Sequence, residues 1–411
     1  MKSTNSMKEK NHENSDSRMT KNERIETYLQ KNYDFRFNVV KSKPEFRDKE
    51  TDKPFAPVSK FDINSFKRKM NNTLGIFTSS ENIRAILESD FAPKVYPVKD
   101  YFNYLPRFDP KNNRYIRQLA QTVTVANPEK WSEYLVKWLI GVVANALHDV
   151  GCQNYTCLVL TGEQGRFKTT WLDHICPQSL QNYLFTGKID PQNKDVLTLI
   201  AEYLFINIDD QLKELNKRDE NELKNLITTP AVKYRRPYDV YIEEYPHLAS
   251  FMASVNGNEF LTDPTGSRRF LPFEVISIDI DTMKNINMDN VFSEILWLYE
   301  NGYRYWFDTS EIEELHNFSR SFHVQTVEYE LLMKGFVKPE SEEKDCFMTT
   351  AEVLGYLKAY TNLLLSEKRM GEALRKAGFD RIVKRRDNNT NPVYGYRIRK
   401  IIPNPFIDSI L

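Results

Sequence analysis

The sequence predicts an α/β protein whose central sheet is mostly parallel. Three continuous apolar runs, which begin near Cys157, Tyr203 and Leu248, have the character of strands that are buried on both faces. Helical segments alternate with these runs, as the connections between parallel strands require. A turn that contains glycine leads from the first run directly into an apolar helix. Because parallel strands end at one edge of their sheet, we expect a ligand site at that edge.

Composition excludes several classes of protein. The chain has 411 residues, enough for two or three domains, and its 57 basic residues balance its 57 acidic ones. Four cysteines without a C-x-x-C pair exclude a disulfide scaffold and argue against a zinc ribbon. The longest apolar stretch, near residues 138–147, is too short to span a bilayer, and the N-terminus lacks the apolar core of a signal peptide. We therefore expect a soluble, cytoplasmic protein without a membrane partner, in which any nucleic-acid contact comes from local basic patches.

The order of the segments predicts four regions. These are a polar, disordered tail (1–23), a mostly helical N-terminal domain (24–150), the α/β domain (151–330) and a small C-terminal domain (340–411). The N-terminal domain is expected to begin with a helix from Arg24, a strand over 35–40 and a loop or hairpin over 41–60. Two helices over 63–92 follow, the second with a cap at Ser79. Two more helices are expected over 113–148, and the segment 131–147 is apolar enough to be buried.

The turn after the first apolar run resembles the phosphate-binding loop G-x-x-x-x-G-K-[ST], and it lies in the expected context between a buried strand and an apolar helix. Glycines let successive backbone N–H groups point at phosphate oxygens, and the helix N-terminus adds its positive end. Lys168 would reach the β- and γ-phosphates of ATP, and the Thr169 hydroxyl would bind Mg²⁺. The candidate nucleotide-binding residues are Gly162, Glu163, Gln164, Gly165, Arg166, Phe167, Lys168, Thr169 and Thr170.

One residue departs from this pattern. Phe167 stands immediately before the lysine, where the pattern has glycine. If the backbone needs a positive φ angle there, a phenylalanine strains it. Gly165, two residues earlier, could supply the missing flexibility. The alternative interpretation of the whole segment is an ordinary strand–turn–helix with a solvated lysine.

An acidic pair ends the second apolar run. Asp209 and Asp210 follow the strand predicted over 203–208, so parallel strands would place them beside the phosphate-binding loop. Both are candidate metal ligands together with Thr169. We assign Asp209 to Mg²⁺ and Asp210 to the attacking water. The alternative is that the two aspartates only cap the helical segment that follows.

Further polar residues follow the third run. Asn256 ends this strand, where its amide could hydrogen-bond the γ-phosphate or the attacking water. Arg268 and Arg269 then form an adjacent pair at a turn, and arginine is suited to stabilising phosphate charge in a transition state. A salt-bridged surface pair is the alternative for the arginines.

These residues together resemble the virulence-associated E family, a group of superfamily 3 helicases within the AAA+ ATPases of phages, plasmids and pathogenicity islands. The resemblance is carried over about residues 155–275 by GEQGRFKTTW, LFINIDD, TPAVKYRRPYDVYIEEYP and ASVNGNEFLTDPTGSRRFLPFEV. It implies an AAA+-like P-loop fold and a homo-oligomeric, usually hexameric, ring with ATP and Mg²⁺ bound between subunits. Lys168, Asp210 and Asn256 would act in one subunit, and Arg268 or Arg269 would reach a neighbour's site as an arginine finger.

The resemblance also implies a β-hairpin between Asp210 and Asn256 that contacts single-stranded DNA in the ring channel. Lys233, Arg235 and Arg236 alternate with tyrosines in this stretch, which suits contact with phosphates and bases. In some relatives this stretch packs at the subunit interface instead, and a solvated basic loop is a further alternative.

The C-terminal domain has the outline of a winged helix. Two helices, 350–362 and 366–377, precede two strands around residues 387–391. Residues 366–400 contain eleven Lys and Arg against four Asp and Glu, a concentration of charge typical of phosphate contact. The DNA bound by this domain could be duplex. The residues expected to contact it are Lys368, Arg369, Lys384, Arg385 and Arg386. A winged helix that binds protein is the alternative.

The sequence thus predicts an ATP-driven DNA helicase or translocase for the replication of a phage or mobile genetic element. Two other classes stay open. One is a DNA-binding replication initiator or regulator that uses nucleotide as a switch without unwinding. The other is an ATPase in phage interference or packaging, with a protein as its target.

Overall fold

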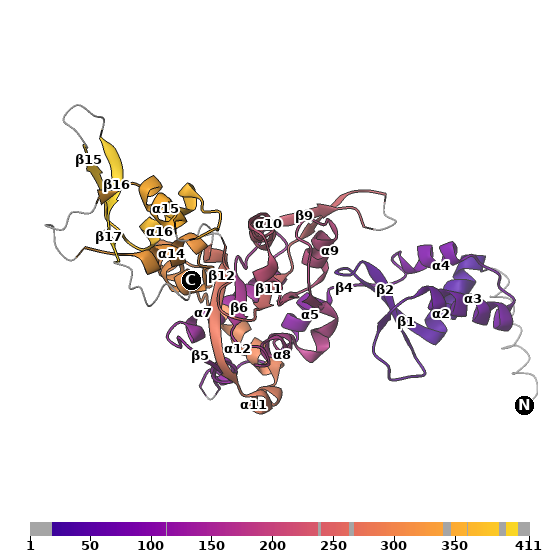
Figure 1. Ribbon diagram of the computed structural model, residues 1–411. Helices are drawn as coiled ribbons and strands as arrows, with labels where there is room; N and C mark the ends of the chain where they lie inside the picture. Colours follow the sequence, from indigo (N-terminus) through magenta and orange to yellow (C-terminus); the bar gives the residue numbers. More distant parts are fainter. Residues whose placement is uncertain are drawn as a thin grey trace, which may run out of the picture. The chain divides into compact units, whose positions relative to one another are not determined.

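The computed structural model describes residues 19–111, 113–236, 240–262, 267–339, 347–359, 361–385 and 392–401 (Figure 1). The chain divides into two compact units, one of residues 1–258 and 263–320 and the other of residues 259–262 and 321–411. Most of the expected tail, residues 1–18, lies outside the described residues. Helix α2 (Lys21–Asn32) begins at Lys21, within the last residues of the range expected for the tail. Thr20 and Glu23 form a capping box that fixes this start.

The first part of unit 1 has a small core of its own. Strand β1 (Tyr33–Asn38) pairs with β2 (Lys43–Asp48) in antiparallel register, so the segment after residue 40 forms a hairpin. The short strands β3 (Ala56–Pro57) and β4 (Lys94–Val95) complete a four-stranded sheet in the order β3-β2-β1-β4. Helices α3 (Lys60–Leu74) and α4 (Ser80–Leu87) pack on it, and Ser79 caps α4 as predicted.

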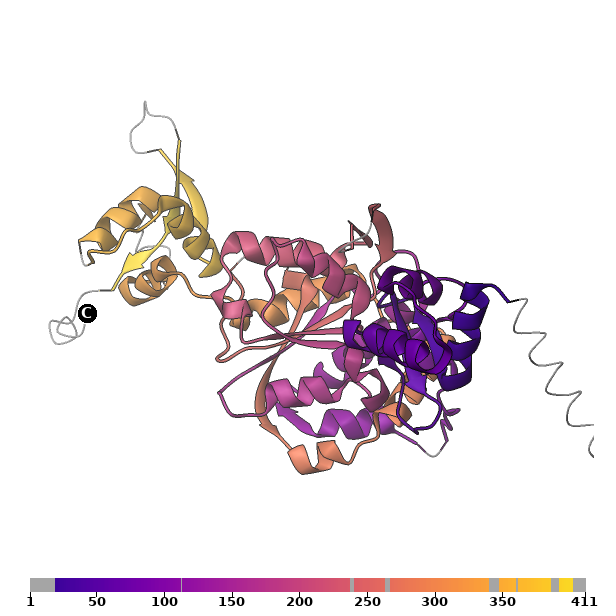
Figure 2. The same ribbon diagram turned by 90° about the vertical axis from the view of Figure 1, so that its right-hand side faces the viewer.

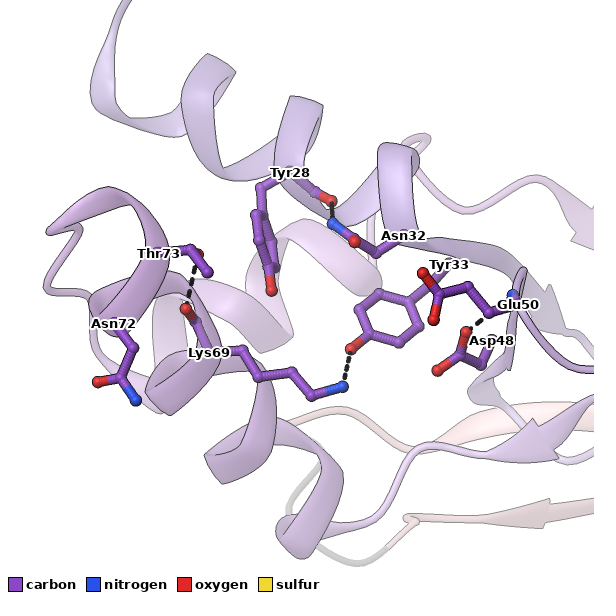
Figure 3. Close-up of a pocket in the computed structure, with 8 residues that line it drawn as sticks. All are labelled: Tyr28, Asn32, Tyr33, Asp48, Glu50, Lys69, Asn72 and Thr73. Atoms are coloured by element: carbon purple, nitrogen blue, oxygen red, sulfur yellow. Dashed lines mark hydrogen bonds between the residues drawn. The ribbon is translucent and has the colours of Figure 1, made fainter.

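A polar cavity of about 290 Å³ lies between α2, β2 and α3 (Figure 3). The ammonium group of Lys69 donates a hydrogen bond to Tyr33 Oη at 2.8 Å, and Asp48 adds a favourable electrostatic interaction. These contacts raise the pKa of Lys69, with the Tyr33 hydrogen bond as the main cause. The cationic side chain of this cavity is therefore already partnered within the fold.

The rest of unit 1 is built on a six-stranded sheet with the order β5-β12-β6-β11-β8-β7. Every pairing is parallel except that of β12 with β5. The α/β class and the mostly parallel sheet are thus confirmed. The strands are β5 (Val123–Val125), β6 (Cys157–Thr161), β7 (Leu184–Gly187), β8 (Phe205–Asp209), β11 (Ser250–Ser254) and β12 (Phe270–Ile278).

Helices cover both faces of this sheet (Figure 2), which explains why every residue of β6 and β11 is buried. Helix α7 (Trp131–Leu147), which the sequence groups with the N-terminal helices, shares one hydrophobic core with the sheet. Trp138 in α7 and Trp171 in α8 (Lys168–His174) are fully buried there. The other helices of this part are α5 (Pro97–Asn103), α6 (Tyr115–Gln121), α9 (Asp195–Glu202), α10 (Lys217–Thr228), α11 (Ile280–Lys284), α12 (Met288–Glu300) and α13 (Thr309–Phe318).

Unit 2 begins earlier than the sequence suggests, because residues 321–339 pack with the C-terminal part. Residues 260 and 261 bond to the backbone of Phe322, which ties the short segment 259–262 to this unit. Its elements are α14 (Val327–Gly335), β13 (Phe336–Val337), β14 (Phe347–Met348), α15 (Thr350–Lys358), α16 (Glu367–Lys376), β15 (Arg381–Lys384), β16 (Val393–Arg397) and β17 (Arg399–Lys400). Strands β15 and β16 pair in antiparallel register after the two helices, as the sequence predicts.

Within the described ranges, no helix has both the length and the apolar character needed to cross a membrane.

Candidate functional site

The candidate site begins at the loop between β6 and α8, which uses three residues with positive φ. These are Gly162 (124°), Gly165 (82°) and Phe167 (58°). A Cβ atom on Gly162 would lie 2.9 Å from the carbonyl oxygen of Val275, so only glycine fits there. Gly162 also exchanges backbone hydrogen bonds with Gly257, at 3.0 and 3.4 Å. The loop is therefore held against the neighbouring strands at its start.

Phe167 adopts the left-handed conformation that the loop pattern normally assigns to glycine. For a residue with a Cβ atom this conformation costs about 1–2 kcal/mol. The side chain is 57% exposed, so the aromatic ring does not fill the inside of the loop. The strain expected from the sequence is present, and it lies in the backbone conformation of Phe167.

The loop backbone offers donors to an anion. Within the described residues, the backbone N–H groups of residues 163–167 make no hydrogen bond of good geometry. Successive free N–H groups next to a helix start form an anion-binding concavity. The donor set of the loop fits a phosphate group. Glu163, Gln164, Arg166 and Thr170 are exposed around it, with Arg166 paired to Glu163 at 2.6 Å.

Lys168 is buried at the first position of α8. Its Nζ donates hydrogen bonds to the carbonyl oxygens of Gly162 (3.0 Å) and Glu163 (2.7 Å) and to Oδ1 of Asn256 (3.3 Å). Burial lowers the pKa of Lys168, and the nearby Asp210 carboxylate opposes this effect. The ammonium group is thus held inside the loop rather than solvated at the surface, in contrast to the alternative interpretation.

Thr169, Asp209 and Ser254 form a compact cluster of oxygens. Oδ1 of Asp209 accepts hydrogen bonds from the hydroxyls of Thr169 and Ser254, both at 2.8 Å, and the two hydroxyls lie 3.0 Å apart. Sequence reasoning missed Ser254, although it ends β11 and is the register partner of Asp209. Among the described residues no group of three or more His, Cys, Asp or Glu could hold a metal ion. One carboxylate with hydroxyls still fits Mg²⁺, which usually keeps several of its waters.

Asp210 has a different neighbour from Asp209. It follows β8 with φ 47°, a conformation that aspartate tolerates better than most residues. Its carboxylate accepts hydrogen bonds from the backbone N–H (3.0 Å) and the side-chain amide (2.6 Å) of Asn256. Since Asn256 also contacts Lys168, these three predicted residues form one hydrogen-bonded network. The structure brings the carboxylate of Asp209, not that of Asp210, next to Thr169.

Arg268 and Arg269 lie away from this network. They precede β12, whose first residue, Phe270, pairs with Cys157 at the start of β6. The loop between β6 and α8 follows the other end of β6, four residues further on. At 3.2–3.4 Å per residue, this is a separation of roughly 13 Å along the strand. Within one chain, the arginines therefore lie at the amino ends of the parallel strands, and Lys168 lies at their carboxyl ends.

The predicted hairpin is present as β9 (Ala231–Tyr234) and β10 (Glu243–Pro246), which pair in antiparallel register. Lys233 forms an ion pair with Glu244 at 2.7 Å. Arg236 lies 3.5 Å from Glu202, and its guanidinium stacks over the Tyr245 ring. Arg235 is exposed and has no such partner in the described part of the chain.

The end of this hairpin is apolar. Val240, Tyr241 and Ile242 are each more than 70% exposed, a feature that sequence reasoning did not single out. Residues 237–239 lie outside the described residues. The hairpin therefore presents this apolar group to solvent together with the charged side chains of Lys233, Arg235, Glu243 and Glu244, which are also exposed.

The basic residues of unit 2 are arranged along α16 and the strand after it. Lys368 and Arg369 are exposed on α16, and Arg385 is exposed after β15. The ammonium group of Lys384 lies 6.0 Å from the centre of the Phe347 ring. Arg386, the fifth predicted contact, lies outside the residues that the structure describes.

Comparison with known proteins supports the resemblance seen in the sequence. The virulence-associated protein E-like domain matches residues 106–324, more than half of the chain. A solved structure titled as the apo structure of the NrS-1 C-terminal region (305–718) has a TM-score of 0.51 at 10% identity, over 91% of this chain and 98% of that one. Two A-form structures of the same region, at 10% and 11% identity and the same coverage, give TM-scores of 0.46 and 0.48, which are too low to add to this.

At this identity the first likeness shows the fold alone, and no curated protein matches the chain. The matched residues include the loop between β6 and α8, both aspartates, Asn256 and the arginine pair. The chain belongs to the virulence-associated protein E-like domain family.

Proposed function

We propose that this protein is an ATP- and Mg²⁺-dependent DNA helicase or translocase that acts in the replication of a phage or mobile genetic element. The observation that carries this proposal is the convergence of Lys168, Thr169, Asp209, Asp210 and Asn256 at the carboxyl edge of one parallel sheet. Membership of the virulence-associated protein E-like family supports a role in replication.

In this proposal, the loop between β6 and α8 is a P-loop that binds the ATP phosphates. The free N–H groups of residues 163–167 would hold phosphate oxygens, and Lys168 would exchange its contacts with loop carbonyls for the β- and γ-phosphates. Thr169 and Asp209 would hold the Mg²⁺ ion, directly or through its waters, with Ser254 orienting Asp209. Bound Mg²⁺ would neutralise phosphate charge as it develops during hydrolysis.

Asp210 is the residue best suited to polarise the attacking water. Asn256 donates one hydrogen bond to each of its two carboxylate oxygens, which fixes the carboxylate orientation. Each oxygen keeps a further lone pair to accept a proton or a hydrogen bond from water. Asn256 also touches Lys168, so it can position the water relative to the γ-phosphate.

An arginine finger would have to come from another subunit. Arg268 and Arg269 are at the sheet edge opposite the phosphate-binding loop of their own chain, so they are suited to act only on a neighbour's ATP. Arg268 is the exposed one of the two and is our choice for this role. A homo-oligomeric ring, expected to be a hexamer, provides such a neighbour.

DNA contact is proposed for two surfaces. The hairpin β9–β10 would face single-stranded DNA in the ring channel, with Arg235 and the exposed Tyr241 as its contacts. The order of two helices followed by an antiparallel strand pair in unit 2 supports a winged helix. Its exposed Lys368, Arg369 and Arg385 would bind the phosphates of duplex DNA.

The proposal is tested by the rate of ATP hydrolysis with and without single-stranded DNA. We expect stimulation by DNA that is lost in Lys168→Ala and Asp210→Asn. Arg117→Gln, an exposed arginine on α6, is the matched control. Binding of duplex DNA without any hydrolysis would contradict the motor and favour the nucleotide-switched regulator. Hydrolysis that ignores DNA would favour an ATPase with a protein target.

A further inference from the structure

A second cavity of unit 1, of about 360 Å³, lies at the amino end of β6 and β12. The exposed aromatic side chains of Tyr155 and Trp306 line it together with Arg268 and Arg269. The buried polar side chains of Asn154 and Thr156 also contribute to its wall. Because the phosphate-binding loop follows the other end of β6, this cavity is separate from that site.

The charged side chains that line the cavity in the described part of the chain are both positive. Among the described residues that line it, there are two guanidinium groups and no carboxylate. Nε of Arg269 is buried without a hydrogen-bond partner in the described part of the chain. Burial and the adjacent Arg268 both lower the pKa of Arg269. Half-buried cations without a counter-ion are costly, so the arrangement favours an anionic ligand.

The remaining wall is suited to a flat, aromatic group. Tyr155 is 48% exposed and Trp306 is 53% exposed, although large aromatic side chains normally bury most of their surface. The Tyr305 hydroxyl donates a hydrogen bond to Oε1 of Gln153 at 3.1 Å, which fixes the chain next to Trp306. Aromatic side chains beside arginines are the means by which proteins hold a base and its phosphate together.

We infer that this cavity binds one nucleotide, with Arg269 on its phosphate and Tyr155 and Trp306 against its base. The volume is at the small end of the range for ligand pockets, which suits a single nucleotide and not a longer segment. The nucleotide is either free in solution or one unit of a single strand, since both present the same phosphate and base.

This inference goes beyond the proposed function and separates the two arginines. Arg268 lines the cavity but is exposed, so it stays available for a neighbouring subunit. Arg269, half-buried, belongs to the cavity of its own chain. The cavity does not depend on whether the phosphate-binding loop hydrolyses ATP.

The test uses full-length Lys168→Ala protein, so that the phosphate-binding loop contributes as little as possible. Binding of AMP and of an eight-residue oligothymidylate is measured by titration calorimetry and by quenching of tryptophan fluorescence. We expect saturable binding of at least one of the two probes. Loss of the charge-assisted contact in Arg269→Gln should weaken it about tenfold or more. Trp306→Leu should remove most of the quenching, and Arg117→Gln is the control.

The two probes distinguish the sources of the ligand. Binding of AMP supports a site for free nucleotide, and binding of the oligonucleotide alone supports a site for a single strand. Arg269→Lys, which keeps the charge, should retain more affinity than Arg269→Gln. Binding of neither probe, or equal binding by folded Arg269→Gln protein, would overturn the inference. Loss of ATP hydrolysis in the Lys168 variant bears on the phosphate-binding loop and leaves this result unaffected.

Discussion

Oγ1 of Thr169 lies 2.8 Å from Oδ1 of Asp209, although forty residues separate the two in the chain. Thr169 is in the first turn of α8, and Asp209 is the last residue of β8. Strand β11 lies between β6 and β8 in the sheet, and its last residue, Ser254, completes the contact. Side chains from three separate segments of the chain thus meet because β6, β11 and β8 are parallel and their carboxyl ends are aligned.

The first prediction concerns metal binding at this point. Mg²⁺ should increase the affinity for nucleotide in the wild-type protein. Asp209→Asn and Thr169→Val should each reduce this Mg²⁺-dependent increase at least about tenfold, because each substitution removes an oxygen ligand of the ion or disturbs its orientation. Titration calorimetry with a non-hydrolysable ATP analogue, in Mg²⁺ and in EDTA, measures this. Thr124→Val, on an exposed position of β5, is the control. An unchanged effect of Mg²⁺ in both site variants would rule out this cluster as the metal site.

A second prediction follows from the backbone at Phe167. Asparagine adopts the left-handed conformation more readily than phenylalanine, and the ring loses little packing because it is mostly exposed. Phe167→Asn should therefore raise the free energy of unfolding by about 1 kcal/mol, whereas the β-branched Phe167→Val should lower it by a similar amount. Urea denaturation of the two variants tests this. Equal stability of both would mean that the left-handed conformation is absent in solution.

The hairpin arginines should behave differently from each other. Arg236 pairs with the largely buried Glu202, so Arg236→Gln should lower the free energy of unfolding by about 2 kcal/mol. The exposed Arg235→Gln should change it by less than about 0.5 kcal/mol. If Arg235 contacts a DNA phosphate, its loss should reduce the slope of log affinity against log salt concentration by about one. Anisotropy titrations with single-stranded DNA at several salt concentrations measure that slope, and no change would remove Arg235 from the DNA surface.

Buried His247 predicts a pH dependence of stability. Burial lowers its pKa from 6.5 to about 4. The carbonyl oxygens of Thr229 and Ala249 lie beside its two ring nitrogens, and only the protonated ring can donate to both, so they offset this in part. The unfolded chain therefore binds a proton more readily than the folded one. The contribution of His247 to the free energy of unfolding is therefore fully present above pH 6.5. It is lost as the pH falls toward 4, by about 3 kcal/mol in total. The free energy of unfolding should fall less steeply over this range in His247→Gln, and parallel curves would contradict the assignment.

The sequence predicts those parts of the fold that local patterns encode. Continuous apolar runs predict β6, β8 and β11, and the Ser79 cap predicts the start of α4. Strand β5 has only three residues and β7 only four, which is too short for a periodic signal, so both were missed. The start of unit 2 depends on hydrogen bonds between segments sixty residues apart, which no local pattern reports.

The same division holds for the candidate site. The loop pattern and the strand ends identify Lys168, Asp210 and Asn256. These residues lie together because a parallel sheet brings the carboxyl ends of its strands to one side. The ion pairs that engage Lys233 and Arg236 depend on carboxylates brought close by folding, Glu244 on the opposite strand and Glu202 on α9, so the sequence shows the basic residues without their partners. Charge read from sequence overestimates free charge wherever tertiary partners exist.

The central claim is that residues 162–170 bind the phosphates of ATP. Its most direct test is the affinity of a non-hydrolysable ATP analogue with Mg²⁺ for the wild-type protein and for Lys168→Ala, measured by titration calorimetry. The account predicts saturable binding to the wild type and a loss of about a hundredfold or more in the variant, because a buried ammonium contact to phosphate is removed. Equal affinity of the two proteins, or no binding by the wild type, would contradict it.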